Sequence, residues 1–297
     1  MRSWAFPWIA TVRGLCRQPS GNSEATNGSR SGKPSALASE PEANEPPIAE
    51  PHPPALRITG ILPHPVRLAL IADVHSNLEA LTAVLAEVDK RGVDQIVCLG
   101  DVVGYGADAQ ACVDLVRERC TVTVMGNHDE AVVTGNVQFL PKDGQAAALH
   151  NRQHLDAEAL AWLAALPDEA VVENTTLVHA TPQLPKRWLR ADSFQVSHAQ
   201  FQHFQTPICF AGHMHMPAVV GEKIGQMRVK PGGRFFVVCG STGQPRDANP
   251  RAFVGFFDTE AFAYEPVRVP YNVDEAARRI AEAGLPMELG RRLRSGR

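Results

Sequence analysis

The chain has 297 residues, of which 44% are hydrophobic and 21% are charged, and its formal net charge is -3. This length can bury a substantial core, either in one domain or in two small ones. The nearly balanced charge provides no electrostatic footprint for bulk nucleic acid or for a membrane surface, so we expect neither as a partner.

The six cysteines show no spacing that is typical of a metal site or a redox motif. Cys98, Cys209 and Cys239 fall inside apolar runs, where a free cysteine behaves as a small buried hydrophobic residue. We therefore predict a cytoplasmic protein, in a compartment that keeps thiols reduced. The sequence leaves the oligomeric state open.

The first 62 residues differ in composition from the rest of the chain. Between residues 17 and 55 Pro, Ser, Asn, Glu, Ala and Gly dominate, and no aromatic residue occurs. Such a segment buries too little apolar surface to offset the entropy lost on ordering. We predict that residues 1–62 are a disordered extension, with an organelle transit segment as the alternative, and that residues 63–297 form the folded domain.

The folded part is predicted to begin near Pro63. Residues 77–90 carry apolar side chains at helical spacing, and a second helix is predicted after Asp108, a suitable N-cap residue. The alternation of strands and helices favours parallel strands joined by right-handed crossovers. The apolar or β-branched runs that predict buried strands cover residues 66–72, 95–99, 122–125, 176–178 and 208–211.

The second half of the chain has a different pattern. Residues 130–166 are predicted to be mostly helical, with Leu160, Leu163 and Leu166 as the clearest apolar row. Short β segments bounded by Gly and Pro favour a second sheet packed on the first, and thus an α/β fold. They cover residues 218–221, 226–230, 235–239, 253–258 and 263–269.

Five short polar motifs directly follow five of the predicted strands. Residues just beyond strand ends lie together at the carboxyl edge of an α/β sheet, where such folds build their sites. Carboxylates, an amide carbonyl and neutral imidazoles are the groups that bind metal ions able to activate water and hold a phosphate. In order along the chain, the motifs are Asp73-x-His75, Gly100-Asp101, Gly126-Asn127-His128-Asp129, His179 and Gly212-His213-x-His215.

Each motif by itself has a less specific interpretation. Asp-x-His occurs often by chance, Gly-Asp is a common turn, and a lone histidine such as His179 is more often a buried core residue than a ligand. Because five motifs occur in series, each after a predicted strand, we interpret them together as a two-metal phosphoesterase site.

Other polar residues leave two interpretations open. Asn77 is equally suited to binding phosphate and to capping the following helix. Arg246 could pair with a substrate phosphate, but a bond to Asp247 within its own loop is favoured. The basic segment 186–190 (Lys-Arg-Trp-Leu-Arg) could clamp a nucleotide, yet a solvated basic surface is favoured.

Between about Val66 and Val269 the chain resembles the calcineurin-like metallophosphoesterases, most closely their small prokaryotic predicted phosphodiesterases. This resemblance implies a four-layer α/β/β/α sandwich with two packed mixed sheets and a metal site at the carboxyl ends of the strands. Residues 271–297 are similar to the helical tail of that subgroup. Beyond the five motifs, the resemblance rests on Asp73-Val-His75-Ser-Asn77, Gly104-Tyr105-Gly106 and residues 240–247 (Gly-Ser-Thr-Gly-Gln-Pro-Arg-Asp).

The resemblance also implies a ligand set for two divalent ions bridged by Asp101. Mixed nitrogen and oxygen donors suit Mn²⁺, Fe²⁺, Zn²⁺ or Ni²⁺. One ion would be held by Asp73, His75, Asp101 and His215. The other would be held by Asp101, Asn127, His179 and His213.

His128 and Asp129 are the expected catalytic residues. His128 would face the substrate and stabilise or protonate the leaving oxygen, and Asp129 could accept a hydrogen bond from His128 or from another group near the site. The implied reaction is hydrolysis of a phosphoric ester, in which a hydroxide that bridges the two ions attacks phosphorus in line.

We predict a phosphodiesterase that acts on a small phosphoester or a nucleotide-type substrate. A phosphomonoesterase or protein phosphatase is the alternative, although protein Ser/Thr phosphatases of this superfamily normally have an Asp-Arg pair where this chain has Gly104-Tyr105. A non-catalytic scaffold with the same fold is disfavoured, because the implied ligand set is complete.

Overall fold

Residues 56–57 and 65–297 are described by the computed structural model. The predicted disordered extension, residues 1–62, lies outside these ranges except for strand β1 (Leu56–Arg57). This short strand pairs in parallel with β5 (Glu169–Val172). An edge strand such as β5 offers a row of N–H and C=O groups for pairing, which accounts for this addition to the sheet.

One sheet has five strands in the order β11-β10-β2-β3-β4. Its parallel strands β2 (Arg67–Ile71), β3 (Gln95–Cys98) and β4 (Val122–Thr123) all end at the same edge. Strands β10 (Ala252–Asp258) and β11 (Ala263–Val269) continue the sheet in antiparallel pairs. The mixed sheet therefore collects the residues that follow β2, β3 and β4.

The second sheet has the order β1-β5-β6-β7-β9-β8. Its strands β6 (Thr175–Val178), β7 (Ile208–Ala211) and β9 (Phe235–Val238) are parallel to one another, whereas β5 and β8 (Ala218–Gly221) are antiparallel to their neighbours. The strand that we predicted at residues 226–230 is wrong, because this segment is a loop. A turn through Gly225, with φ 88°, returns the chain so that only Gln226 bonds to the end of β8.

The helices follow the predicted amphipathic patterns. Helix α1 is capped by Asn77, whose side chain accepts a hydrogen bond from the backbone N–H of Ala80, and the helix buries five apolar residues on one face. The bounds of the α-helices are α1 Leu78–Arg91, α2 Ala109–Arg119, α3 Asn127–Thr134, α4 Lys142–His154, α5 Ala157–Ala164, α6 Phe194–Ala199, α7 Val273–Glu282 and α8 Met287–Ser295. Two short 3-10 helices, η2 and η3, cover Pro185–Arg187 and Gln200–Gln202.

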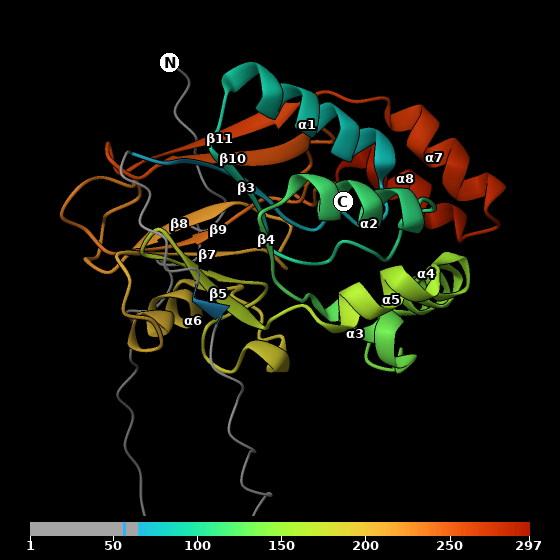
Figure 1. Ribbon diagram of the computed structural model, residues 1–297, viewed down its shortest axis with the longest axis horizontal. Coiled ribbons are helices and arrows are strands. Elements are labelled where there is room, and N and C mark those ends of the chain that lie inside the picture. Colours follow the sequence, from blue (N-terminus) through green and yellow to red (C-terminus); the bar gives the residue numbers. More distant parts are fainter. Residues whose placement is uncertain (1–55, 58–64) are drawn as a thin grey trace, which may run out of the picture. The chain divides into compact units, whose positions relative to one another are not determined.

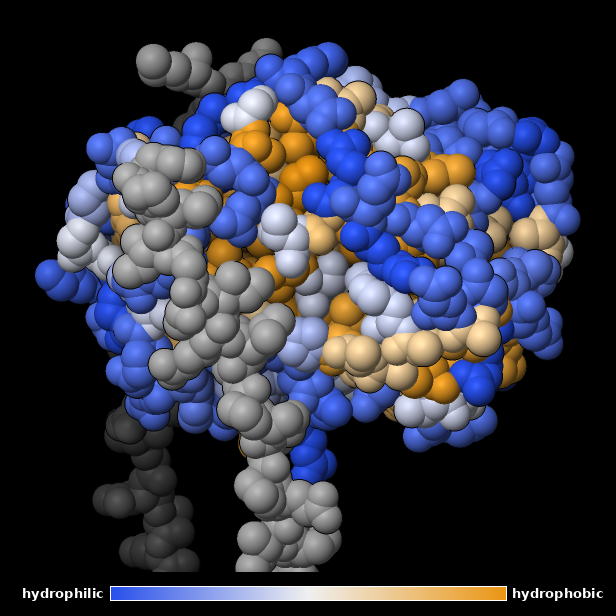
Figure 2. All heavy atoms as spheres, viewed as in Figure 1, coloured by the Kyte–Doolittle hydropathy of each residue, from blue (hydrophilic) through white to orange (hydrophobic). Residues whose placement is uncertain are grey.

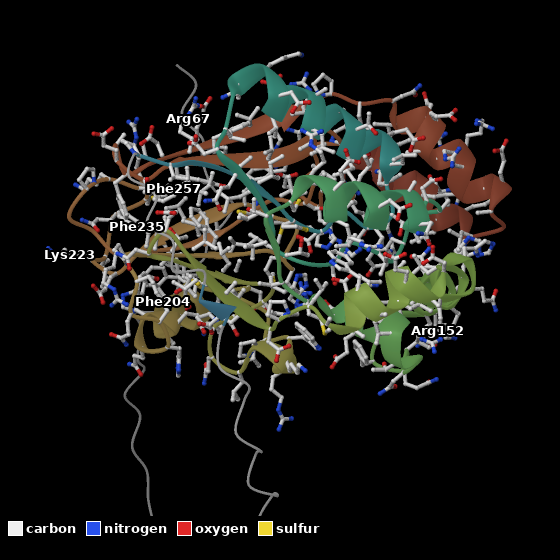
Figure 3. All side chains as sticks on the ribbon, in the orientation of Figure 1. Arg67, Arg152, Phe204, Lys223, Phe235 and Phe257 are labelled. Carbon is white, nitrogen blue, oxygen red and sulfur yellow. The ribbon has the colours of Figure 1, made fainter. Side chains whose placement is uncertain are left out.

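Alternation along the strands separates three apolar cores. In β2, Leu68 and Leu70 point to the core between the sheets, whereas Ala69 and Ile71 point to the core under α1 and α2. Phe235 and Phe257 lie in the layer between the sheets, and Phe204 packs on the outer face of the second sheet (Figure 3). Helices therefore cover the outer face of each sheet, and the predicted four-layer α/β/β/α sandwich is confirmed (Figure 1).

The C-terminal residues form two packed helices. The inner surfaces of α7 and α8 bury Ile280, Leu289 and Leu293 in a cluster that also contains Tyr105. Hydrophilic side chains cover most of their outer surface on the face shown in Figure 2. Among the residues described, no helix combines the length and apolar character needed to span a bilayer.

Candidate active site

The backbone turns sharply at the strand ends that carry the predicted ligands. An extended strand would direct Asp73 and His75 to opposite faces, but both have left-handed φ angles, 53° and 50°, which bring them to the same side. Non-glycine residues adopt this conformation rarely, and such strained residues cluster at functional sites. Among the seven predicted ligands, the left-handed ones are Asp73, His75, Asp101, His213 and His215.

Backbone hydrogen bonds hold these turns together. The amides of Asp73 and His75 donate to the carbonyls of Gly100 and Asp101, at 3.0 and 2.9 Å. The amide of His213 donates to the Asp73 carboxylate at 3.1 Å, which connects the two sheets at their carboxyl edges. The loops therefore meet on the side of the sheets where α3 and α8 lie (Figure 1).

Three of the histidines among the predicted ligands have a ring nitrogen that contacts a backbone carbonyl. Nδ1 of His75 lies 3.0 Å from the carbonyl oxygen of Val103, and Nδ1 of His179 lies 2.7 Å from that of Leu99. Nδ1 of His215 lies 2.5 Å from the carbonyl oxygen of Gln244. A carbonyl only accepts hydrogen bonds, so each Nδ1 carries the proton. In a neutral ring, as in His75 and His215, Nε2 then presents a lone pair, which is the arrangement of a metal-binding histidine.

In the first group of possible metal ligands, the facing nitrogen and oxygen atoms carry no hydrogen that could form a hydrogen bond between them. Nε2 of His75 lies 3.1 Å from Nε2 of His215 and 3.6 Å from Oδ2 of Asp101. Nε2 of His215 lies 3.5 Å from Oδ1 of Asp73. Two lone pairs and two carboxylates repel one another at these distances unless a cation lies between them, so this group fits a divalent ion.

A second group of possible metal ligands shares Asp101. Oδ2 of Asp101 lies 3.3 Å from Nε2 of His179, which is also 3.2 Å from Oδ1 of Asn127 and 3.2 Å from Nδ1 of His213. Thus one carboxylate faces both groups of donors. The seven predicted ligands thus lie close together in the structure, and the ligand atoms of His75, Asp101 and His128 form a further group with metal-binding spacing.

Electrostatics in the cluster favour a positive charge. Burial lowers the pKa of His75 and His215 well below the usual value of histidine, so both rings are neutral. Burial likewise lowers the pKa of His213 to about 3. For His179 burial also acts downward, but the Asp101 carboxylate outweighs it and raises the pKa to about 9. A divalent ion in this position would supply the positive charge that the carboxylate attracts.

Glycine is required at two positions because of close packing. A Cβ atom on Gly126 would lie 2.2 Å from Oδ1 of Asp101, and a Cβ atom on Gly104 would lie 2.5 Å from Nδ1 of His128. Gly104 also has φ 97°, which other residues rarely adopt. Both glycines therefore allow the backbone to approach a site residue closely.

His128 is buried beside His75 and Asp101, where it lines a cleft. Its ring is 4.4 Å from the ring of Tyr105 and 4.9 Å from that of His75, and burial lowers its pKa to about 4. Its Nδ1 is buried and, among the described residues, has no hydrogen-bond partner. Gly104 lies against Nδ1 and Gly144 against Cε1, which leaves Nε2 on the open side of the ring.

Asp129 holds loops in place instead of contacting His128. Its carboxylate accepts hydrogen bonds from the backbone amides of Asp101 (2.8 Å), Val103 (3.1 Å) and Gly126 (3.0 Å). We expected Asp129 to accept a hydrogen bond from His128 or from another group near the site, and the structure shows other groups, the three backbone amides. This residue positions Asp101 and is not placed to act on a substrate.

The two predicted substrate residues have different outcomes. Both polar atoms of the Asn77 side chain are used inside the fold, by the N-cap of α1 and by the carbonyl of Gly243, so Asn77 is a capping residue. Arg246 does not bond to Asp247, which pairs with Arg268 instead. The guanidinium of Arg246 donates hydrogen bonds to the side-chain oxygen of Gln244 and lies over the ring of Tyr105, at the edge of the site.

A cleft with a volume of about 290 Å³ opens beside the clusters. Our interpretation of segment 186–190 as a solvated surface is right for Lys186, Arg187 and Arg190, which are exposed, and wrong for the half-buried Trp188; Trp188 and Arg190 also line the cleft. The tryptophan among basic residues was the only sequence signal for this wall. The other cleft residues that sequence reasoning missed are Phe139, Leu140 and Pro141, which belong to no motif.

Comparisons with known proteins agree with this geometry. Residues 66–261 match the family described as the calcineurin-like phosphoesterase superfamily domain. The chain is 34% identical over 241 residues to an uncharacterized protein of Methanocaldococcus jannaschii, covering 77% of this chain and 98% of that protein.

Solved structures with a similar fold point the same way. The crystal structure of a metallophosphoesterase from Sphaerobacter thermophilus is 34% identical, with a TM-score of 0.71, over 79% of this chain and all of that one. A hypothetical protein from Pyrococcus horikoshii shares the fold at 19% identity, with a TM-score of 0.67, over 78% of this chain and 99% of that one.

Proposed function

Since the chain belongs to the calcineurin-like phosphoesterase superfamily and is thereby a metal-dependent phosphoester hydrolase, we propose that it is a phosphodiesterase with a site for two divalent ions. The observation that carries the proposal is the position of Asp101. Its Oδ2 faces His75 in one group of donors and His179 in the other, at 3.6 and 3.3 Å. A carboxylate shared in this way is the arrangement of a bridging ligand.

We assign His128 and Arg246 different roles in the hydrolysis. Divalent ions, when bound, supply positive charge next to the phosphoryl oxygens and make a water molecule easier to deprotonate. His128 presents Nε2 to the open side, where it donates a proton or a hydrogen bond to the leaving oxygen. Arg246, held by Gln244 and Tyr105, contributes a positive charge that stabilises a non-bridging phosphoryl oxygen.

The surroundings of Tyr105 support a diester over a monoester. By resemblance, protein phosphatases of the superfamily have an arginine in this region, and here the neutral ring of Tyr105 packs on His75 and His128. A phosphomonoester carries about two negative charges near neutral pH and gains most from a further cation beside Arg246, which Tyr105 does not supply. A phosphodiester carries one charge and a second organic group, for which the apolar wall of the cleft provides a surface.

The donor set does not select one metal. The two clusters contain imidazole nitrogens, carboxylates and one amide oxygen, which suit Mn²⁺, Fe²⁺, Zn²⁺ and Ni²⁺. The described cysteines Cys98, Cys209 and Cys239 lie buried in or beside strands and belong to neither cluster.

A comparison of two aryl substrates tests the proposal. The protein, reconstituted with Mn²⁺, is given bis(p-nitrophenyl) phosphate and p-nitrophenyl phosphate, which release the same phenolate. We expect the larger kcat/KM for the diester. A larger kcat/KM for the monoester would support the phosphomonoesterase alternative, and a failure to hydrolyse either would contradict the assignment of an active site.

A further inference from the structure

The cleft beside the metal clusters has an apolar wall that the hydrolysis of a simple phosphoester does not require. Phe139, at the loop between α3 and α4, is 48% exposed, although a phenylalanine side chain gains by leaving water. Leu140 and Pro141 continue this wall, and Trp188 lines the same cleft from the segment that follows β6. Exposed apolar side chains gathered in a cleft are typical of a ligand-binding surface.

Trp188 is held firmly at this position. Its backbone has φ 50°, and Leu184, at the start of the same short helix, has φ 71°, so a non-glycine residue adopts a left-handed conformation at each end of the segment. The indole Nε1 donates a hydrogen bond to Oε2 of Glu130 at 2.9 Å, and the ring meets that of His179 edge to face at 5.7 Å. The indole is therefore fixed next to a predicted metal ligand.

Positive charge borders the same wall. Arg190 lines the cleft two residues after Trp188, and its ion pair among the described residues, from Nε to Oδ2 of Asp192, is long at 3.9 Å. Arg246 lies at the other part of the cleft, where residue 244 holds it. An apolar and aromatic surface thus lines the same cleft as the candidate metal ligands and a loosely paired arginine. Such a surface suits a flat, uncharged ring attached to a phosphate.

We propose that Trp188 is a specificity residue that stacks on a planar aromatic group carried by the phosphodiester, such as a nucleobase or an aryl ring. This inference rests on the proposed function, because the phosphate at the metal clusters places the ring against the cleft wall. Stacking on an aromatic side chain tolerates every base, since each base has a π face. We therefore expect selection for an aromatic substituent without strong selection among bases.

Two substrates with one leaving group test the inference. Thymidine 5′-(p-nitrophenyl) phosphate and methyl p-nitrophenyl phosphate both release p-nitrophenolate, so they differ in the group that Trp188 would contact. We expect the metal-loaded protein to prefer the thymidine ester in kcat/KM by roughly 10-fold or more. Trp188→Ala and Trp188→Leu should lose most of this preference, and Trp188→Phe should keep a substantial part of it.

A matched control and a third substrate sharpen the result. Phe194 is also an exposed aromatic residue, 43% exposed, but it does not line the cleft, so Phe194→Ala should leave the preference unchanged. Phenyl p-nitrophenyl phosphate separates the two sources of an aromatic group. A preference for it that depends on Trp188 as much as that for thymidine indicates any flat ring, whereas a preference for thymidine alone indicates a nucleoside.

Binding provides a readout that does not depend on hydrolysis. Thymidine 5′-monophosphate should quench the tryptophan emission of the metal-loaded protein, and Trp188→Phe should remove this quenching although Trp4, Trp8 and Trp162 remain. Quenching without hydrolysis of any ester would support the inference and contradict the proposed phosphodiesterase. Equal losses of kcat/KM for both esters in Trp188→Phe and Trp188→Leu would overturn the inference, because they would mean that Trp188 only orders the loop beside His179.

Discussion

The ring of Tyr105 lies 4.4 Å from that of His128 on one side, and on the other it belongs to the apolar cluster formed by α7 and α8. Leu289 and Leu293 of α8 are buried in that cluster. The C-terminal helices thus form the back of the site through one residue, and their packing fixes the face of the His128 ring. The C-terminal segment is part of the active-site architecture.

This relationship predicts the effect of changing Tyr105. Tyr105→Ala should lower kcat on bis(p-nitrophenyl) phosphate by about 10², because a small displacement of a catalytic group has an effect of this size. Tyr105→Phe should stay within a few-fold of the unchanged protein, since the ring makes the contacts that the structure shows. Steady-state kinetics with both variants measure it. A Phe variant as slow as the Ala variant would show that the hydroxyl is what matters.

The two kinds of site residue should respond differently to substitution. Asp101→Ala removes the carboxylate that faces both clusters, so metal and activity should be lost together. His128→Ala should retain its metal while kcat falls by roughly 10²–10⁴, the usual range for a positioned proton donor. Elemental analysis and rates on the same samples measure both effects. The loss in His128→Ala should be smaller for a good leaving group, such as p-nitrophenolate, than for an alkoxide.

Metal analysis also provides the contradicting result for this division of roles. If His128→Ala loses as much metal as Asp101→Ala, then His128 is a ligand and the proton-donor role is wrong.

Gly104 offers a test of close packing against His128. Gly104 and Gly225 have similar φ angles, 97° and 88°, but only at Gly104 does an added Cβ meet another residue, Nδ1 of His128 at 2.5 Å. Both alanine variants carry the backbone strain, so the difference between them isolates the clash. Gly104→Ala should lower the free energy of unfolding by about 1–3 kcal/mol more than Gly225→Ala, and only Gly104→Ala should lower kcat. Thermal unfolding and kinetics decide it, and equal effects on both would contradict the packing argument.

The arginines of one short segment provide a matched pair. Arg190 lines the cleft, whereas Arg187, three residues earlier, is exposed and does not. Arg190→Ala should raise KM for anionic substrates several-fold, and the effect should shrink as salt screens the charge. Arg187→Ala removes the same charge from the same segment and should leave KM unchanged. Parallel increases of KM in both variants would indicate a general effect of net charge.

The convergence of the candidate metal-binding residues could be predicted from the sequence because it depends on local patterns. Each motif directly follows an apolar run, and strand ends meet at one edge of a sheet, so Asp73, Asp101, Asn127 and His213 were expected to converge. The same reasoning could not decide between local alternatives. Whether Asn77 binds phosphate or caps α1 depends on where Gly243 lies, which is a contact 166 residues away.

The residues of the cleft wall could not be predicted from the sequence, for a related reason. Phe139 belongs to a loop with no motif, and it becomes a site residue only because α4 packs Gly144 against His128 and Tyr105. Arg246 donates a hydrogen bond to Gln244 and not to the adjacent Asp247, because the Asp247 carboxylate pairs with Arg268 on β11. Long-range packing therefore decides the surroundings of the site, whereas local pattern decides its ligands.

A titration of the chelated protein with Mn²⁺ tests the central claim most directly. Hydrolysis of bis(p-nitrophenyl) phosphate is followed while the metal is added in known equivalents to protein freed of bound ions. The shared carboxylate of Asp101 predicts almost no activity before metal is added and a rise that saturates near two equivalents per chain. Chelated protein that hydrolyses the diester as fast as the reconstituted protein, or saturation at one equivalent, would contradict the two-ion site.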